Sequence, residues 1–420
     1  MYILYLLLAL LILLVMVTIH EFGHYVAGKL LHFKINEFSI GFGKSLYSHK
    51  SKKTGEIFSI RLVPLGGYCA FEGEDGNGKV KGSFTKMAPW KRLIVLFFGP
   101  FFNILSAMIF SIILLCVTGY DIPKIYTVDS IPVVISTTTD VVWQTTDKIV
   151  DINGVLVENT SPQYLSYSIK AYAEEKNVQN SSYLIRYYRN GEYYSTTANV
   201  EFKKNNDLQT GDVIWKVNGT KIDFGTNNTF TNLIQEQSTE SVILTVNRDG
   251  EYQDIEVSLF DYGVALTDSE GNIINASKVI GITSTPYQFR FGEAILRSVP
   301  FTFGLAYKIL ESLWLLISGQ LGLSAVGGPL TTITTIATYT QNNFASFFIL
   351  LPLIAVNLGV FNLLPIPALD GSKMVFTTIE WIRRKPINPK VENAIYNIGF
   401  IVLLGLVIIA DLYHIIFIRI

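Results

Sequence analysis

The fold is decided by the stretch Met1-Tyr-Ile-Leu-Tyr-Leu-Leu-Leu-Ala-Leu-Leu-Ile-Leu-Leu-Val-Met-Val-Thr-Ile19, which continues directly into His20-Glu21-Phe22-Gly23-His24. The first nineteen residues carry no charged side chain. A helix rises about 1.5 Å per residue, so a run of this length can cross the apolar core of a bilayer, which is about 30 Å thick. The run lacks the basic start and the small-residue cleavage site of a signal peptide. We therefore expect a retained membrane-spanning helix with ionisable groups at its end.

The whole chain is too apolar for an ordinary soluble protein. Charged residues make up 16% of its 420 residues, hydrophobic residues make up 49%, and the mean hydropathy is +0.35. As buried helices of a soluble domain, the uncharged stretches would need more polar sequence around them than the chain provides. We predict a polytopic α-helical membrane protein with four transmembrane helices. The predicted spans are Met1–Ile19, Leu93–Tyr120, Gln341–Leu369 and Ala394–Ala410.

Basic residues are concentrated in two segments between the predicted spans. One segment runs from His32 to Arg92 and the other from Lys373 to Lys390. Because short loops rich in Lys and Arg stay on the cytoplasmic side, both segments predict the same orientation. The long segment at about 121–290 then lies outside the cell. The net charge of −1 gives no indication of a nucleic-acid partner, and none is expected.

The outer segment contains an internal repeat. Asp147-Lys-Ile-Val-Asp-Ile-Asn-Gly154 is echoed by Asp212-Val-Ile-Trp-Lys-Val-Asn-Gly219, and Arg189-Asn-Gly-Glu-Tyr193 by Arg248-Asp-Gly-Glu-Tyr252. Each Asn-Gly or Asp-Gly pair lies between alternating apolar runs, as tight hairpin turns require. We therefore predict two copies of one small αβ module.

The two copies, at about 121–200 and 201–290, resemble PDZ domains. The pattern Gly-Asp-x-Ile-x-x-Val-Asn-Gly is best kept at Gly211–Gly219, and Thr146 replaces its first glycine in the first copy. No glycine-rich carboxylate-binding loop is recognisable in either copy. A steric gate that excludes large substrates and a receptor for peptides therefore both remain open.

His20 and His24 are spaced to share one metal ion. Positions four apart on a helix differ by about 40° around its axis, so both imidazoles lie on one face. Neutral imidazole is a good ligand for Zn²⁺, and the adjacent Glu21 can take a proton from water that the metal activates. This chemistry hydrolyses peptide bonds. The alternative is a pair of histidines and an ion-paired glutamate at a membrane interface.

A third ligand is offered by Asp370, the first charged residue after the uncharged run from Ser312 to Leu369. It stands in Asn362-Leu-Leu-Pro-Ile-Pro-Ala-Leu-Asp-Gly371. Two prolines break a membrane helix, which a bilayer tolerates only where the freed backbone lines a cavity or packs on protein. By the predicted topology this carboxylate shares the depth of the two histidines. A carboxylate at such a break is a candidate functional group.

These motifs together resemble the site-2 protease family of intramembrane zinc metalloproteases, in its bacterial PDZ-containing branch. Gly99-Pro-Phe-Phe-Asn103, Pro64-Leu-Gly-Gly-Tyr68 and Gly328-Pro329 are similar to that branch as well. The similarity covers roughly Thr18–Val117 and Glu293–His414.

The resemblance implies a role for each site residue. His20, His24 and Asp370 would bind Zn²⁺, Glu21 would act as the general base, and Asn362 would contact the substrate backbone. It also implies a multi-pass protein of the bacterial inner membrane, with the PDZ-like region extracytoplasmic and the active site near the cytoplasmic side.

Two further elements are expected beside the spans. Glu37–Tyr47 and Ile57–Val63 alternate around the turn Lys53-Thr-Gly-Glu56, which predicts a β-hairpin. An ordinary cytoplasmic hairpin and a clamp that takes substrate as an added strand are both open on these residues, and the family resemblance favours the membrane-associated clamp. Glu293–Ser318 mixes charged and apolar residues, as an interfacial helix does.

The predicted organisation is 1–120 with two spans and the hairpin, 121–290 with the tandem PDZ-like modules, and 291–420 with the interfacial helix and two spans. The function expected from it is intramembrane cleavage of single-span membrane proteins by a zinc metalloprotease, for example trimmed anti-sigma factors or signal-peptide remnants. The alternative is a membrane-tethered PDZ scaffold with a structural or vestigial metal site.

Overall fold

The computed structural model describes residues 2–74, 80–120, 122–157, 161–223, 228–322 and 327–418. They form two compact units, which are Met1–Thr118 with Phe289–Ile420, and Gly119–Gln288. We call the first the helical unit and the second the inserted unit. Asp121, at which the predicted insert begins, lies outside the described residues.

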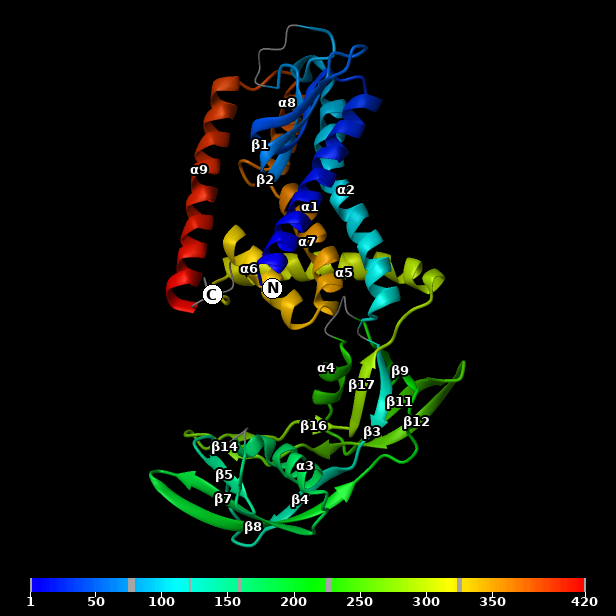
Figure 1. Cartoon of the computed structure of the whole chain (residues 1–420), viewed down its shortest axis with the longest axis vertical. Coiled ribbons are helices and arrows are strands. Elements are labelled where there is room, and N and C mark those ends of the chain that lie inside the picture. The colour runs from blue at the N-terminus through cyan, green and yellow to red at the C-terminus, as the bar shows by residue number, and fades with distance from the viewer. Residues whose placement is uncertain are drawn as a thin grey trace. The chain divides into compact units, whose positions relative to one another are not determined.

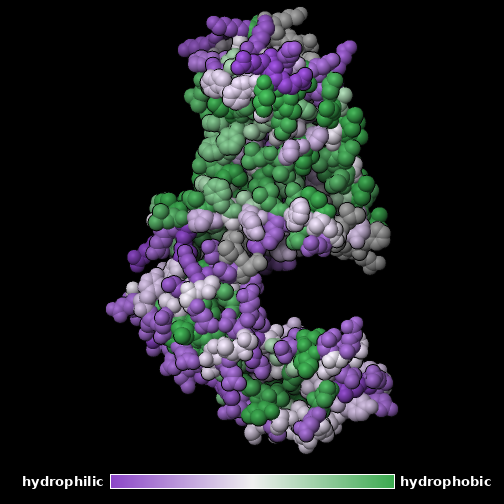
Figure 2. All heavy atoms as spheres, turned by 180° about the vertical axis from the view of Figure 1, so that it is seen from behind, coloured by the Kyte–Doolittle hydropathy of each residue, from purple (hydrophilic) through white to green (hydrophobic). Residues whose placement is uncertain are grey.

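Long apolar helices make up most of the helical unit (Figure 1). The helices are α1 (Tyr2–Leu30), α2 (Pro89–Val117), α5 (Phe291–Ile317), α6 (Pro329–Asn342), α7 (Ala345–Leu363), α8 (Asp370–Arg383) and α9 (Pro389–Tyr413), with short helical turns at Phe84–Lys86 and His414–Ile418. α2 packs between α1 and α7. On the face shown in Figure 2, hydrophobic side chains cover the middle of this unit and hydrophilic ones lie beyond them. Such a belt is stable against lipid rather than water.

Five helices are long and apolar enough to cross a membrane, one more than predicted. They are Tyr2–Leu30, Pro89–Val117, Phe291–Ile317, Ala345–Leu363 and Lys390–Ile416. Four of them correspond to the predicted spans, and the additional one is α5. This helix is the least apolar of the five, contains the ion pair Lys308–Glu311 and lies crosswise to α1 and α2 in Figure 1. A multi-pass membrane protein with an inserted β-rich region is confirmed.

The basic segment between α1 and α2 forms a curled antiparallel sheet from two long strands, β1 (Ile35–Lys50) and β2 (Ile57–Phe71). Both strands bend, so that Phe38 pairs with Phe58 on one side and with Cys69 on the other. The predicted hairpin is thus present but longer than expected. In order across the sheet, the paired segments are 45–50, 57–61, 35–40 and 67–71.

α9 is fastened to the rest of the helical unit near both of its ends. Asp411, which is 8% exposed, accepts hydrogen bonds from the backbone N–H groups of Leu330 and Thr331 at 3.2 and 3.0 Å, and so caps the start of α6. Near the other end, the Tyr396 hydroxyl donates to the carbonyl oxygen of Ala368 at 2.9 Å. The second bond holds the loop that precedes α8.

The inserted unit contains two larger sheets, two two-stranded sheets, and two short helices, α3 (Leu165–Lys176) and α4 (Phe230–Gln235). The first sheet has the order β4-β8-β7-β5-β6, with β4 (Ile131–Thr137), β5 (Lys148–Ile152), β6 (Val155–Leu156), β7 (Ser182–Arg189) and β8 (Glu192–Lys203). The second has the order β12-β11-β9-β3-β17, with β3 (Pro123–Val128), β9 (Val213–Val217), β11 (Ser241–Arg248), β12 (Glu251–Ser258) and β17 (Ile282–Pro286). The remaining short strands are β10 (Thr220–Lys221), β13 (Phe260–Asp261), β14 (Leu266–Thr267), β15 (Ile273–Ile274) and β16 (Lys278–Val279). Because β3 precedes the first sheet in the chain but pairs in the second, the two modules are nested rather than strictly consecutive.

The sequence echoes correspond to equivalent structures in the two modules. The turns at Asn153-Gly154, Asn190-Gly191, Asn218-Gly219 and Asp249-Gly250 all have positive φ at both residues, as tight hairpin turns require. The echoed acids and bases also pair: Arg189 binds Asp147 through two hydrogen bonds of 2.7 and 2.5 Å, and Arg248 binds Asp212 through two of 2.7 Å.

Candidate metal centre

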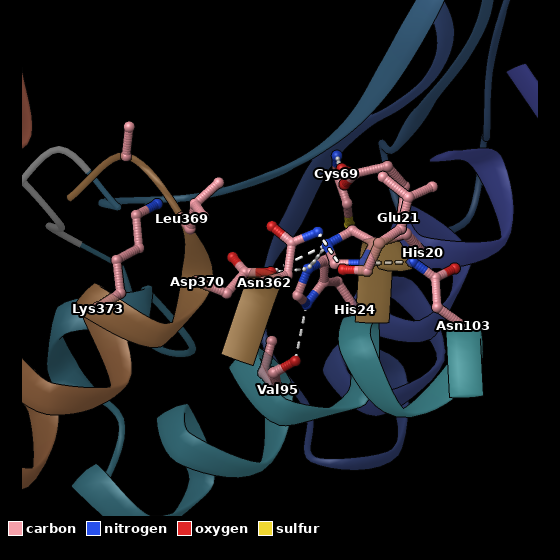
Figure 3. A network of polar contacts seen from close by, with 12 residues as sticks. His20, Glu21, His24, Cys69, Val95, Asn103, Asn362, Leu369, Asp370 and Lys373 are labelled. Carbon is pink, nitrogen blue, oxygen red and sulfur yellow. Dashed lines mark hydrogen bonds and ion pairs between the residues drawn. The ribbon is translucent and has the colours of Figure 1, made fainter. Parts of the chain in front are cut away.

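Two imidazoles and one carboxylate meet at a single point inside the helical unit (Figure 3). His20 and His24 project from one face of α1, and each is 7% exposed. The Oδ2 atom of Asp370 lies 2.9 Å from Nε2 of His20 and 3.2 Å from Nε2 of His24, and the two nitrogens lie 3.2 Å apart. Among the described residues, this is the one group of three or more His, Cys, Asp or Glu residues able to hold a metal ion.

The loop 364–369 brings Asp370 to this point. Pro365 and Pro367 end α7 and prevent it from running into α8, so Asp370 becomes the first residue of a new helix. Gly371 allows the turn to close, because a Cβ atom there would lie 2.1 Å from the carbonyl oxygen of Leu364. Ala368 adopts the left-handed conformation, with φ of 79°, and its carbonyl oxygen accepts the bond from Tyr396.

Groups on α2 orient both imidazoles. Nδ1 of His24 lies 2.8 Å from the carbonyl oxygen of Val95, which can only accept, so this nitrogen carries the proton. Asn103 is fully buried, its amide nitrogen lies 3.3 Å from Nδ1 of His20, and its Oδ1 atom has no partner. If this amide is rotated by half a turn, Oδ1 of Asn103 accepts a hydrogen bond from Nδ1–H of His20, so these two atoms are paired. Each Nε2 atom then points into the cluster as an acceptor.

The donor set fits a zinc ion. With both Nδ1 atoms protonated, the cluster holds three acceptors and no hydrogen between them, an arrangement that requires a cation. Two imidazole nitrogens and one carboxylate oxygen are ligands that Zn²⁺ prefers, and three protein ligands leave one position open for water or substrate. The hydrogen bonds behind the imidazoles match the outer shell that metal-binding histidines require.

Gly99 on α2 makes room for the two imidazoles. A Cβ atom there would lie 2.3 Å from Nε2 of His24 and 2.9 Å from Cε1 of His20. Gly23 on α1 likewise allows the two helices to approach, because its Cβ atom would lie 2.2 Å from the carbonyl oxygen of Phe98. Small residues at a helix contact permit such close approach within a membrane.

Glu21 lies between the cluster and the edge of the β-sheet. Its Oε2 atom accepts a hydrogen bond of 3.0 Å from the backbone N–H of Cys69 in β2. Burial raises the pKa of the Cys69 thiol, so the side chain stays neutral and only its backbone contributes here. Within the described residues no third strand pairs with this edge of β2. The sheet therefore presents a free strand edge beside the glutamate.

The structure brings together all five residues predicted for the site. Asn362, on the last turn of α7, lies beside Asp370 and the histidines in Figure 3. Its amide donates to the carbonyl oxygen of Leu358 at 2.9 Å, which leaves its Oδ1 atom and a second N–H available.

The supporting residues Val95, Gly99, Asn103 and Cys69 were not predicted for the site. Gly99 and Asn103 lie in the family-like Gly-Pro-Phe-Phe-Asn motif, but a polar amide within a span can also link two helices, so the motif alone does not assign them to the site. Val95 and Cys69 act through backbone atoms, which leave no signal in side-chain chemistry.

The family assignment follows from comparison with known proteins. The model of peptidase family M50 matches residues 8–406. The chain belongs to peptidase family M50. It is 25% identical to the regulator of sigma E protease of Haemophilus influenzae, over 94% of this chain and 95% of that protein. It is 24% identical to the zinc metalloprotease RasP of Oceanobacillus iheyensis over 94% and 95%, and 25% identical to the protease RseP of Yersinia pestis over 94% and 96%.

Membership of family M50 confirms the resemblance to site-2 proteases that the motifs carried. The protein is an intramembrane zinc metalloprotease, and its cofactor is Zn²⁺. The alternative of a PDZ scaffold with a vestigial metal site therefore loses its support.

Proposed function

We propose that this M50 protease cleaves single-span membrane proteins within the bilayer, as a step of regulated intramembrane proteolysis. The observation that carries the proposal is the convergence of His20, His24 and Asp370 beside Glu21, among helices apolar enough to span a membrane. The Haemophilus influenzae relative is named regulator of sigma E protease. From the family resemblance we propose trimmed anti-sigma factors as one substrate class. Signal-peptide remnants are the other class that we propose.

Each residue has one role in this proposal. His20, His24 and Asp370 hold Zn²⁺, and Val95 and Asn103 keep the imidazoles in the tautomer that binds metal. The ion, when bound, lowers the pKa of water and polarises the scissile carbonyl group. Glu21 takes the proton of the attacking water and delivers it to the nitrogen of the leaving amine. Asn362 binds the substrate backbone through its remaining amide atoms.

The free edge of β2 can hold the substrate in the extended conformation that hydrolysis needs. A helical substrate hides its peptide bonds in its own hydrogen bonds, and pairing with a strand exposes them. The backbone N–H of Cys69 points away from β1 toward Glu21, so a strand added at this edge would lie next to the proposed base. This geometry supports the clamp over an ordinary hairpin.

Replacing Glu21 with Gln tests the catalytic assignment. We expect cleavage of a model single-span substrate to fall by about 10²-fold or more, because a general base is lost, while zinc content stays near that of the unchanged protein. Removing a proposed ligand should lower both cleavage activity and zinc content, as tested in His20→Ala, His24→Ala and Asp370→Ala. Full zinc content and full activity in Asp370→Ala would contradict the site as proposed.

We further propose that four helices span the membrane and that α5 lies at its outer surface. Ion-paired Lys308 and Glu311 within α5, and its crosswise direction, support an interfacial position. The two basic segments then face the cytoplasm and the inserted unit faces outward, in a bacterial inner membrane. A cysteine at Asn190 should react with an impermeant thiol reagent in intact cells, whereas one at Lys53 should not. Equal labelling at the two positions would overturn this orientation.

For the inserted unit we propose two PDZ-like modules that act as a size filter. Within its described residues it contains no group of three metal-binding side chains. As a filter it would exclude substrates with large outer domains. Its deletion, with the connection restored, should leave cleavage of a trimmed substrate largely intact and newly permit cleavage of the untrimmed one.

One observation favours peptide binding as a second candidate role. A cleft of about 290 Å³ lies between α4 and the free edge of β17, and its lining includes Phe230, Ile234 and Ile282. At its end Gly281 has φ of 71°, and the N–H groups of Ile280 and Gly281 donate to no other group among the described residues. Adjacent free N–H groups of this kind can bind a carboxylate.

The two roles give opposite results in matched variants. Thr231 lines this cleft, whereas Asn232 is the next exposed residue of α4 and does not. A peptide receptor predicts that Thr231→Arg slows cleavage of the trimmed substrate and that Asn232→Arg does not. The filter predicts that both variants behave as the unchanged protein.

A further inference from the structure

A cleft of about 850 Å³, lined by both charged and apolar residues, lies at the end of the helical unit where α2 begins, α8 ends and α9 begins. Its lining includes Arg92 from α2 and Glu380 from α8. Arg384 and Lys385 follow α8 and also line it. This cleft is separate from the metal centre, none of whose proposed ligands lines it.

The charges of the cleft leave a surplus of cations. Nη2 of Arg92 donates to Glu380 at 2.6 Å, and Glu380 also accepts the backbone N–H of Ile387 at 2.8 Å. Lys373 is paired with Glu74 at 2.6 Å. The lining has four cations, Arg92, Lys373, Arg384 and Lys385, against three acids, Glu74, Glu380 and Glu392.

Two cations of the lining, Arg384 and Lys385, remain available to a ligand. No ion pair within the described residues involves Arg384 or Lys385. The Nε atom of Arg92 is buried and has no hydrogen-bond partner.

The surroundings of the cleft are those of a membrane interface. Val375, Ile379 and Ile382 follow one stripe of α8 and are 42%, 37% and 77% exposed. Trp381, on the side of α8 that lines the cleft, is 52% exposed, and Trp90 at the start of α2 is 44% exposed. An exposed apolar stripe, tryptophans and a basic helix end are typical of a helix at the level of the lipid headgroups.

We propose that this cleft binds the headgroup of an anionic phospholipid, with its phosphate held by Arg384 and Lys385. Basic pockets between transmembrane helices bind such headgroups through charge and hydrogen bonds together. The acyl chains would then lie against Phe376 and Trp381, apolar residues of α8 that line the cleft. Since α8 begins with Asp370, the bound lipid would also hold the helix that starts at the metal centre.

The test measures the lipid that remains on the purified protein. The full chain is reconstituted in vesicles of phosphatidylcholine and phosphatidylglycerol in equal amounts, extracted in mild detergent, and its retained lipids are counted by mass spectrometry. Arg384→Gln with Lys385→Gln removes two cations from the cleft. Arg383→Gln with Lys390→Gln removes two cations from the same segment, and neither residue lines the cleft.

We expect the unchanged protein and the Arg383/Lys390 variant to retain phosphatidylglycerol in preference, and the Arg384/Lys385 variant to lose about a tenfold preference or more. Zinc content checks that each variant is folded. If the Arg384/Lys385 variant does not fold, Thr85→Glu, which adds a negative charge to the lining, should lower the preference instead.

Three outcomes would overturn the proposal. An equal loss in both double variants would indicate diffuse attraction by the basic surface. An unchanged preference in the cleft variants would exclude the site. Displacement of the retained phosphatidylglycerol by inorganic phosphate alone would mean that the cleft takes a soluble phosphate and not a lipid.

Discussion

The two units bury charged groups in opposite ways. In the inserted unit each buried aspartate is paired with one arginine: Asp147 with Arg189, Asp151 with Arg186, and Asp212 with Arg248. In the helical unit, two imidazole nitrogens of His20 and His24 and a carboxylate oxygen of Asp370 lie within 3.2 Å of one another. Burial alone therefore does not mark a functional charge. A buried aspartate that is paired with an arginine stabilises the fold, whereas two imidazoles and a carboxylate that face one another form a candidate metal site.

The largest effect should come from filling the space beside the two imidazoles of the proposed metal centre. Gly99→Ala places a methyl group 2.3 Å from Nε2 of His24, so the ligands themselves must move. We expect zinc content to fall and activity to drop by more than the roughly 100-fold typical of outer-shell changes. Gly405→Ala on α9, whose Cβ atom would meet nothing within 4 Å, is the matched control and should change neither.

Breaking a buried ion pair of the inserted unit should lower its stability and leave zinc binding unchanged. Arg189→Ala leaves Asp147, whose side chain is 0% exposed, as an unpaired buried charge. We expect the inserted unit to lose about 3 kcal/mol of unfolding free energy, with zinc content unchanged. Denaturant unfolding of the full chain, followed by the fluorescence of Trp143 and Trp215 with the other tryptophans replaced by Phe, measures this loss.

Lys176→Ala is the control for that experiment, because its pair with Glu175 is largely exposed and should contribute little. Loss of zinc in Arg189→Ala would contradict the separation of the two units' roles.

A smaller effect is expected from the outer shell of the cluster. Asn103→Leu removes the amide that orients His20 and should weaken zinc binding by about 10- to 100-fold, as competition with a chelator would measure. Ser106→Ala, one turn away, removes a hydroxyl that bonds only the carbonyl oxygen of Asn103. Equal affinities in the two variants would show that Asn103 only fills space.

The smallest effect concerns pH and the inserted unit. Burial raises the pKa of Asp129, but hydrogen bonds from Lys170, Thr127 and Thr283 outweigh it and hold the pKa below its ordinary value of 3.8. The unfolded chain therefore takes up the proton first as pH falls. The stability from Asp129 is complete above that ordinary value and is lost as pH drops through the folded pKa. Asp129→Asn should flatten this part of the curve of unfolding free energy against pH, and an unchanged curve would contradict the assignment.

The local features of the site could be predicted from the sequence, because helix periodicity and the absence of charge are properties of neighbouring residues. The spacing of His20 and His24 places them on one face, and the uncharged run before Asp370 made it the remaining candidate ligand. The role of Asn103 could not be predicted, because an amide within a span can link two helices as well as support a metal ligand.

Features that depend on distant partners were harder to predict. Alternation predicted a hairpin, but it could not indicate that Phe38 pairs on both sides, because alternation does not record the number of neighbouring strands. Nor could it place β3 in the second sheet, whose other strands lie more than eighty residues later. The helices α6 and α8 were not predicted, because α6 is rich in Thr and α8 directly follows a loop with two prolines.

The two fastenings of α9 set the order in which the enzyme matures during synthesis. The first N–H groups of α6 receive their cap only when Asp411 has left the ribosome, and the loop before Asp370 receives its hydroxyl bond only when Tyr396 has done so. His20 and His24 are synthesised hundreds of residues earlier. A nascent chain would therefore carry two of the proposed zinc ligands for most of its translation, and the third would be held in place only when the last helix has been made.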